Sequence, residues 1–165
     1  MNLLNVVCKE KQSKKNLVIV NWTINKRGEL DLIGVIIVGH GNIASELMSI
    51  SQTILGSQEY FRMANVKTGE GEHAIYSKLS ELLDEMKIED VMILSDIFGG
   101  SISNSCLYFA KHKGHIAVVT GVNLPMVLKV LSYRNKVSLN ELVHLACKGG
   151  KDGIIDACGL LNEEK

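Results

Sequence analysis

The stretch Ile33–Gly41, with the sequence IGVIIVGHG, constrains the fold of this chain more than any other. Positions 35–38 hold four consecutive β-branched residues, and a run that is apolar on both faces is typical of a buried strand in a parallel sheet. The strand ends at Gly39-His40-Gly41, and a helical pattern follows at once. In α/β folds such turns line the carboxyl edge of the sheet, where ligands bind. We therefore predict that His40 is the reacting residue and that most of the chain positions it.

Strand and helix patterns alternate along the rest of the chain. We predict further strands over 60–66, 90–94 and 115–120, and helices over 43–55, 72–86, 101–113, 125–133 and 138–148. Ser138 and Glu141 form a capping box, and Gly149-Gly150 is expected to stop the last of these helices. Residues 152–161 fit either a short helix or a strand. The alternation predicts an α/β fold with a doubly wound, mainly parallel sheet and helices on both faces.

The composition narrows the functional classes. The 165 residues include 18 basic and 18 acidic side chains, so no basic field favours nucleic acid or an anionic membrane as a partner. Four scattered cysteines, which lack the close spacing of zinc ligands or redox pairs, indicate incidental thiols in a reducing compartment. The sequence has no apolar run of about 18 residues that could span a membrane. We expect a cytoplasmic protein that needs neither a metal ion nor an organic cofactor.

Residues 1–32 do not share the strand–helix pattern, so we divide the chain into an N-terminal extension, 1–32, and a domain, 33–165. Leu17–Ile24 is apolar enough for a strand, but a polar break follows it. One interpretation is a loosely packed extension. Another is that translation starts at Leu32 as a TTG codon, because residues 26–29 can be encoded by a purine-rich stretch that resembles a ribosome-binding site. The intact mass of the natively expressed protein distinguishes the two, and a mass that includes Met1 excludes the second.

Glycine-containing turns follow three of the predicted strands, around His40, Asp96 and Asn123. In a sheet of order 2-1-3-4 the first and third strands are neighbours, which would bring His40 and Asp96 side by side. A carboxylate that accepts a hydrogen bond from one imidazole nitrogen fixes the tautomer and leaves the other nitrogen as a nucleophile. Asp96 could instead merely cap the following helix, and Asn123 could be a turn residue.

Backbone amides near the same turns could bind an anion. They lie at the helix start after Gly99-Gly100-Ser101 and also after Gly41. A nucleophile, an orienting carboxylate and an anion cradle are the parts needed to form a phosphohistidine. Ser101 could instead be only an N-cap. The other four histidines have no predicted partners and are interpreted as surface or core residues: His73, His112, His115 and His144.

Three motifs give the chain a specific resemblance: GVIIVGHG, then SDIFGGS followed by Asn104, then GVNLPM. In this order they resemble the mannose-type (mannose/fructose/sorbose) IIA domain of the bacterial phosphoenolpyruvate-dependent sugar phosphotransferase system. The likeness spans about 33–154, which is nearly everything except the extension.

The resemblance implies a phosphotransferase that carries a phosphoryl group on a histidine. That histidine receives phosphate from the small histidine phosphocarrier protein and passes it to a IIB component, which serves the membrane sugar permease. The match places the histidine at His40 and its aspartate partner at Asp96. It places the family's Gly-Gly-Ser turn at Gly99, Gly100 and Ser101 and its Asn-Leu-Pro segment at Asn123–Pro125. Together with Gly41, the three turn residues are our candidates for phosphate binding, and Asn123 is a candidate for the rim of the site.

The resemblance also implies a homodimer, in which a C-terminal strand, here 153–158, crosses to the partner. One position departs from the family pattern, because Ile102 stands where the family usually has proline after Gly-Gly-Ser. Proline would pre-set the first helical turn, so its absence is expected to loosen the cradle slightly without removing a reacting group.

Two alternatives to sugar transport stay open. The same histidine could serve regulation of a dihydroxyacetone kinase or of transcription. A nucleotide-binding module is also conceivable, because Gly39, Gly41 and Ala44 fit the dinucleotide fingerprint. That fingerprint also calls for an acidic residue after the second strand, where this chain has Asn65, Val66 and Lys67.

Overall fold

The computed structural model of the chain describes residues 31–163. The possible strand at Leu17–Ile24 and nearly all of the predicted extension lie outside these residues, so the division at residue 32 stays a prediction. The elements are β1 (Gly34–His40), α1 (Ile43–Leu55), β2 (Phe61–Val66), α2 (Glu72–Met86), β3 (Val91–Ser95), α3 (Ser101–Lys113), β4 (Ile116–Thr120), α4 (Leu124–Tyr133), α5 (Leu139–Asp152) and α6 (Ala157–Glu163).

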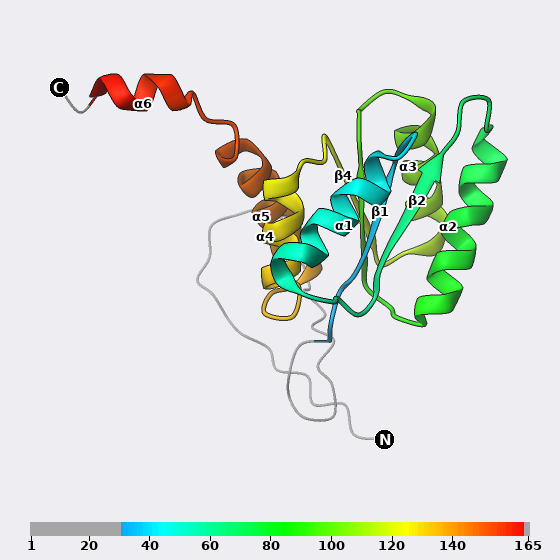
Figure 1. Cartoon of the computed structure of the whole chain (residues 1–165). Helices are drawn as coiled ribbons and strands as arrows, with labels where there is room; N and C mark the ends of the chain where they lie inside the picture. Colours follow the sequence, from blue (N-terminus) through cyan, green and yellow to red (C-terminus); the bar gives the residue numbers. More distant parts are fainter. Residues whose placement is uncertain (1–30, 164–165) are drawn as a thin grey trace, which may run out of the picture.

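The four strands form one sheet of order β2-β1-β3-β4, and every neighbouring pair is parallel. Helices α1, α4 and α5 cover one face of this sheet, whereas α2 and α3 cover the other (Figure 1). This arrangement confirms the predicted α/β fold and strand order.

The core lies in two layers because side chains alternate across the strands. In β1, Val35 and Ile37 pack toward α1, α4 and α5, whereas Ile36 and Val38 pack toward α2 and α3. All four side chains are fully buried. Burying one such side chain contributes about 1.5–3 kcal/mol, so the β-branched run anchors the strand that ends at His40.

The C-terminal helices differ from the sequence-based prediction. Helix α5 does not stop at Gly149-Gly150 but continues to Asp152. A Cβ atom at Gly149 would lie 2.8 Å from the Cβ of Lys129 on α4, so glycine here permits close packing of two helices instead of ending one. Residues 153–156 form a connection and 157–163 form α6, which projects away from the sheet (Figure 1). The predicted crossing strand is therefore absent from 153–158 in this single chain, and its exchange in a dimer stays a prediction.

A buried arginine holds the end of the sheet opposite His40. Arg134, which is only 3% exposed, follows α4. Its guanidinium donates hydrogen bonds to the carbonyl oxygens of Ile33, Glu59 and Tyr60 and to the side-chain oxygen of Gln58, at 2.7–3.4 Å. Burial lowers the pKa of the Arg134 guanidinium, and the nearby charge of Glu59 opposes that shift. The arginine thus joins the start of β1, the turn before β2 and the end of α4.

Replacing this arginine should cost much of the stability of the domain. We expect Arg134→Met to lower the free energy of unfolding by about 2–4 kcal/mol, because it leaves several buried carbonyl groups without donors. Urea unfolding followed by circular dichroism measures the loss. Lys136→Met is the matched control because Lys136 is exposed two residues further on. Equal stability of the two variants would show that the Arg134 contacts do not support the fold.

Candidate active site

His40 and Asp96 meet at the carboxyl edge of the sheet. His40 is the last residue of β1, and Asp96 directly follows β3, the neighbouring strand. The pairing register sets Val38 opposite Ser95, so the two strand ends lie next to each other although 56 residues separate them in the chain. Parallel order in the sheet therefore brings together the two side chains that the sequence analysis paired.

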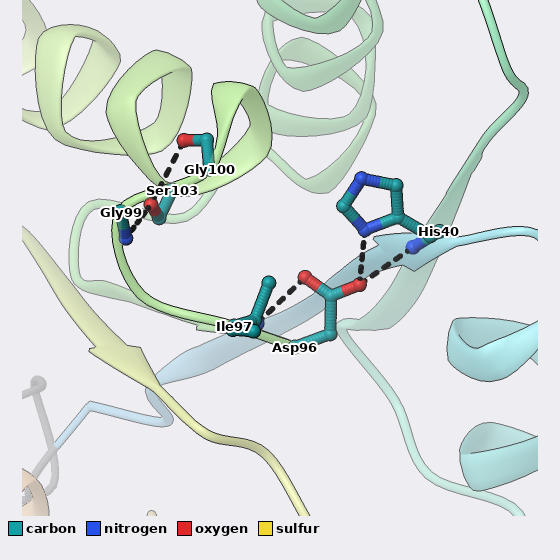
Figure 2. Close-up of polar contacts among 6 residues, drawn as sticks. All are labelled: His40, Asp96, Ile97, Gly99, Gly100 and Ser103. Atoms are coloured by element: carbon teal, nitrogen blue, oxygen red, sulfur yellow. Dashed lines mark hydrogen bonds and ion pairs between the residues drawn. The ribbon is translucent and has the colours of Figure 1, made fainter.

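The contacts between the two residues hold the imidazole in one orientation (Figure 2). The Nδ1 atom of His40 lies 2.6 Å from Oδ2 of Asp96, and the backbone amide of His40 donates to the same oxygen at 2.8 Å. The other carboxylate oxygen accepts from the amide of Ile97 at 2.8 Å. Both oxygens are thus engaged, and the carboxylate cannot rotate without losing these bonds.

The second ring nitrogen faces away from Asp96. Figure 2 shows Nε2 on the far side of the imidazole from the carboxylate. The His40 side chain is 56% exposed, against 11% for that of Asp96. Since a carboxylate can only accept, the proton in the contact is on Nδ1, which leaves a lone pair on Nε2. When the ring is neutral, Nε2 is therefore the nitrogen with an available lone pair, on a side chain that is more than half exposed.

Asp96 is held as a carboxylate by its donors. Partial burial by itself raises the pKa of Asp96, but hydrogen bonds from the backbone and ring of His40 and from the amide of Ile97 outweigh it. The pKa of Asp96 consequently lies below its ordinary value of 3.8. Asp96 is therefore negatively charged at neutral pH.

This lowered pKa predicts an acid-dependent loss of stability. A group with a depressed folded-state pKa stabilises the protein above its unfolded pKa, and the contribution is lost as the pH falls through the folded value. We expect the stability difference between wild type and Asp96→Asn to be constant above about pH 5 and to shrink below about pH 4. Urea unfolding of both proteins from pH 7 to pH 3 measures it. A difference that keeps its size down to pH 3 would contradict the assigned shift.

A glycine next to the histidine permits this close approach. A Cβ atom on Gly39 would lie 2.2 Å from Cγ2 of Ile43 and 3.5 Å from Oδ2 of Asp96. Any larger residue would therefore force the Ile43 side chain at the start of α1 to move and would touch the carboxylate. Gly39 is thus a packing requirement of the site, not a flexible joint.

Of the amides predicted to bind phosphate, two already have acceptors. The amide of Gly41 donates to the carbonyl oxygen of Val66 at 2.9 Å, and that of Gly99 donates to Oγ of Ser103 at 3.0 Å. Within residues 31–163, the amides of Gly100 and Ser101 have no acceptor. Of the four residues predicted to bind phosphate, these two, at the N-terminus of α3, keep amides that can bind an anion.

The start of α3 corrects one alternative from the sequence. The N-cap is Gly100, and Ser101 is the first helical residue, so Ser101 does not cap the helix. The helix begins here without the family's proline. Ile102 is fully buried against the α2 and α3 side of the sheet, and this burial fixes the first turn.

Asn123 has a structural role. Its side-chain oxygen accepts from the amide of Met126, and its side-chain nitrogen donates to the carbonyl oxygen of Gly150, both at 3.0 Å. It therefore caps α4 and ties that helix to α5, as the turn-residue alternative suggests. A place for Asn123 on the rim of the site stays a prediction.

A polar network beside the site was not predicted from the sequence. Asn65, at the carboxyl end of β2, bonds both the amide and the hydroxyl of Ser45 on α1. Lys78 donates to the carbonyl oxygen of Asn65 at 3.0 Å and to Glu70 at 2.5 Å. These bonds fix the helix that follows His40 and the loop after β2. The four residues of this network are scattered polar residues in the sequence, so no local pattern predicts it.

Two further side chains with nucleophilic atoms, Cys106 and His115, cannot act as a nucleophile beside Asp96. Cys106 is buried below the site, and burial together with the charge of Asp96 raises the pKa of its thiol to about 12, so it stays protonated. His115, predicted to lack a partner, in fact lies 3.2 Å from Asp90 and 3.6 Å from Glu89. Those residues flank the start of β3, at the opposite edge of the sheet from His40.

The described part of the chain has neither a cluster of metal ligands nor a membrane-spanning helix. Between residues 31 and 163, the acidic, histidine and cysteine side chains nowhere gather in threes as a metal site would need. No helix in that range has both the length and the apolar character to cross a membrane.

Comparisons with known proteins identify the family of the chain. The family model described as "PTS system fructose IIA component" matches residues 34–147. The chain is 33% identical over 114 residues to the "PTS system fructose-specific EIIA component" of Bacillus subtilis, with 68% of this chain and 78% of that protein covered. It is 32% identical over 124 residues to the "PTS system mannose-specific EIIAB component" of Escherichia coli, with 74% of this chain covered but only 38% of that protein.

Solved structures show the same fold. The phosphotransferase system component EIIA from Streptococcus agalactiae superposes with a TM-score of 0.70 at 26% identity, covering 76% of this chain and 97% of that one. The family match extends over both strands that carry the site and over the helices that follow them. The chain therefore belongs to the mannose-type EIIA family of the sugar phosphotransferase system.

Proposed function

We propose that this chain carries a phosphoryl group on His40, taking it from the small histidine phosphocarrier protein and passing it to a IIB component for sugar uptake. The observation that supports the proposal best is the exposed Nε2 of His40 on a ring whose Nδ1 is held by the buried carboxylate of Asp96. A ring fixed on one side and open on the other can be reached by two different proteins in turn.

Phosphoryl transfer from the donor to His40 needs no reacting groups beyond the two imidazoles and Asp96. The Nε2 lone pair of His40 attacks phosphorus, and a P–N bond forms as the P–N bond of the donor breaks. The bonding electron pair of the broken bond returns to the donor's imidazole nitrogen. The Nδ1 proton of His40 stays in the hydrogen bond to Asp96 throughout, so the product is a phosphorylated imidazolium. Asp96 stabilises the positive charge that develops on this ring.

The N-terminus of α3 supports the charge on the phosphoryl oxygens. The amides of Gly100 and Ser101 are the donors available for this, and a helix N-terminus contributes about 0.3–2 kcal/mol toward an anion. That energy positions the group without trapping it, which suits a carrier that must release phosphate to the next protein. Gly41 and Gly99 shape the turns, since their own amides are occupied.

The homodimer belongs to the same proposal. The C-terminal arm consists of the connection after α5 and of α6, residues 153–163. Four of its large apolar side chains are 54–80% exposed: Ile154, Ile155, Leu160 and Leu161. The arm extends from the domain (Figure 1), and exposed apolar clusters of this kind mark protein contacts. Light scattering of the full-length protein tests the dimer.

A labelling experiment tests the carrier function. The purified protein is incubated with enzyme I, the phosphocarrier protein and labelled phosphoenolpyruvate. We expect acid-labile, base-stable label on the chain, because a phosphoramidate bond to imidazole breaks in acid. The label should be absent when the phosphocarrier is left out. Failure of the complete mixture to label the wild-type protein would refute the proposal.

A further inference from the structure

Helix α1 starts shortly after His40, and within the part of the chain that the structure describes it has no local side-chain cap. The N-cap residue, Asn42, has a φ of −104° and a ψ of 7°, unlike the extended backbone that capping residues usually adopt. Gly41, between these two residues, has a left-handed φ of 57°. Since the helix start is not secured locally, the turn that carries His40 depends on contacts from neighbouring elements.

Asn65, near the carboxyl end of β2, caps α1 from the neighbouring strand. Its side-chain oxygen accepts from the amide of Ser45 at 3.2 Å, and its side-chain nitrogen donates to the Ser45 hydroxyl at 3.0 Å. The same hydroxyl donates to the carbonyl oxygen of Asn42 at 2.8 Å. The hydroxyl proton is thereby used, so Oγ of Ser45 can only accept from Asn65. The pair thus needs an acceptor and a donor on one side chain, which an amide provides and a carboxylate does not.

Asn65 is itself held in place from two sides. In the sheet it pairs with Gly39, the residue before His40. Its carbonyl oxygen accepts from Lys78 of α2, whose amino group also donates to Glu70 in the loop after β2. A capping residue that is fixed in this way holds the start of α1 in one position relative to the end of β2.

A shift of the turn would reach the imidazole because one oxygen holds both the backbone and the ring of His40. Oδ2 of Asp96 accepts from the backbone amide of His40 at 2.8 Å and lies 2.6 Å from its Nδ1. The next amide, that of Gly41, donates to the carbonyl oxygen of Val66 at 2.9 Å. A backbone displacement in this turn therefore changes the geometry of the ring, and a misplacement of about 1 Å can slow a reaction by about 10²-fold.

We propose that Asn65 is a positioning residue for phosphoryl transfer: through Ser45 it fixes the start of α1, and thereby the turn that presents Nε2 of His40. The inference rests on the proposed function, because it assigns a role in the same transfer step. The side chain of Asn65 is engaged by Ser45, so it acts on the ring through the backbone and not by direct contact. Its loss should consequently slow the transfer step and leave binding of the donor unchanged.

The kinetic test compares Asn65→Ala with Ser138→Ala. Both variants remove a side chain that caps the start of one helix, but Ser138 caps α5, which begins after the α4–α5 turn at the end of the sheet opposite His40 (Figure 1). Transfer from the phosphorylated phosphocarrier is followed by rapid quench at increasing donor concentrations. We expect the maximal rate to fall about 10-fold for Asn65→Ala, with the half-saturating donor concentration changed less than about twofold. Neither value should change for Ser138→Ala. A wild-type maximal rate in Asn65→Ala would overturn the assignment.

Ser45→Ala checks the route of the effect. This variant removes the hydroxyl but keeps the amide that donates to Asn65, so the maximal rate should fall less than in Asn65→Ala. Because both substitutions break the same contact, the double variant should be no slower than Asn65→Ala alone. Effects that multiply in the double variant would show that Asn65 acts by another route and would overturn the proposed coupling.

The His40 ring gives a readout that does not depend on phosphoryl transfer. In unphosphorylated protein labelled with ¹⁵N-histidine, Asn65→Ala should shift or broaden the Nδ1 resonance of His40 as its contact with Asp96 loosens, whereas Ser138→Ala should keep the wild-type signal. A changed signal in Asn65→Ala would support the positioning role even if the labelling experiment of the proposed function fails. An unchanged signal would contradict the positioning role even if that labelling experiment succeeds.

Discussion

His40→Ala should abolish phosphorylation of the protein by the phosphocarrier. The variant removes the nitrogen to which phosphorus bonds, and no other nucleophile in the described part of the chain occupies that place. Cys106 is buried and protonated, and His115 lies at the opposite edge of the sheet. We expect the rate of labelling to fall by more than about 10³-fold, to the background seen when enzyme I is left out. Autoradiography after incubation with labelled phosphoenolpyruvate, enzyme I and the phosphocarrier measures it.

The control for this prediction is a second histidine. His112→Ala removes an exposed imidazole that lies against Tyr108 on its own helix, and this variant should be labelled at the wild-type rate. Because the His40 side chain is more than half exposed, both variants should also keep the wild-type melting temperature within a few degrees. Undiminished labelling of His40→Ala would place the phosphoryl group elsewhere and overturn the site.

Asp96→Ala should keep the fold but slow phosphoryl transfer by about 10²–10⁴-fold. Without the carboxylate, the ring is free to rotate, Nδ1 is no longer fixed as the protonated nitrogen, and the imidazolium product loses its counter-charge. The amides of His40 and Ile97 also lose their acceptor, so we expect a stability loss of about 1–2 kcal/mol. Rapid-quench measurement of the rate at saturating phosphocarrier separates the chemical step from binding.

Asp96→Asn distinguishes the two roles of the carboxylate. An asparagine oxygen can still accept from Nδ1, so orientation is partly kept while the negative charge is lost. If charge dominates, Asp96→Asn should be nearly as slow as Asp96→Ala. If orientation dominates, it should lie much closer to wild type. Transfer at the wild-type rate in Asp96→Ala would show that the carboxylate does not serve the reaction.

The elements that determine the site could be predicted because their signals are local. The β-branched run of β1 requires burial on both faces, and the family motifs place His40 and Asp96 at the ends of two strands. The sheet order then brings the two residues together. The capping box at Ser138 and Glu141 was also correct, with both of its hydrogen bonds present. Residues close in sequence were enough for each of these predictions.

The errors arose where distant contacts decide the outcome. Gly149-Gly150 resembles a helix stop, but contact with Lys129 on α4 makes the same glycines part of a continuous helix. Phosphate binding at Gly41 and Gly99 stays a prediction, but the bonds of their amides to Val66 and Ser103 could not be foreseen from the sequence. The Arg134 contacts join residues up to 101 positions apart, and no pattern within one segment indicates them.

The family and the site geometry also bear on the alternatives. The dinucleotide fingerprint needs an acidic side chain after the second strand, where it binds a ribose. This chain has Asn65 there, which carries an amide and is bonded to Ser45. The first of the three small residues around His40 is explained by packing, and Gly41 by its positive φ of 57°. A Cβ atom at Gly39 would collide with Ile43, which accounts for the first glycine without any nucleotide.

The most direct test of the central claim is NMR spectroscopy of the His40 ring in ¹⁵N-histidine-labelled protein, before and after phosphorylation. We predict that the unphosphorylated ring carries its proton on Nδ1, and that phosphorus coupling appears on Nε2 once the phosphocarrier has delivered its phosphate. A proton on Nε2 in the free protein, or phosphorus bonded to Nδ1, would contradict the assignment of Asp96 as the group that holds one nitrogen and leaves the other to react.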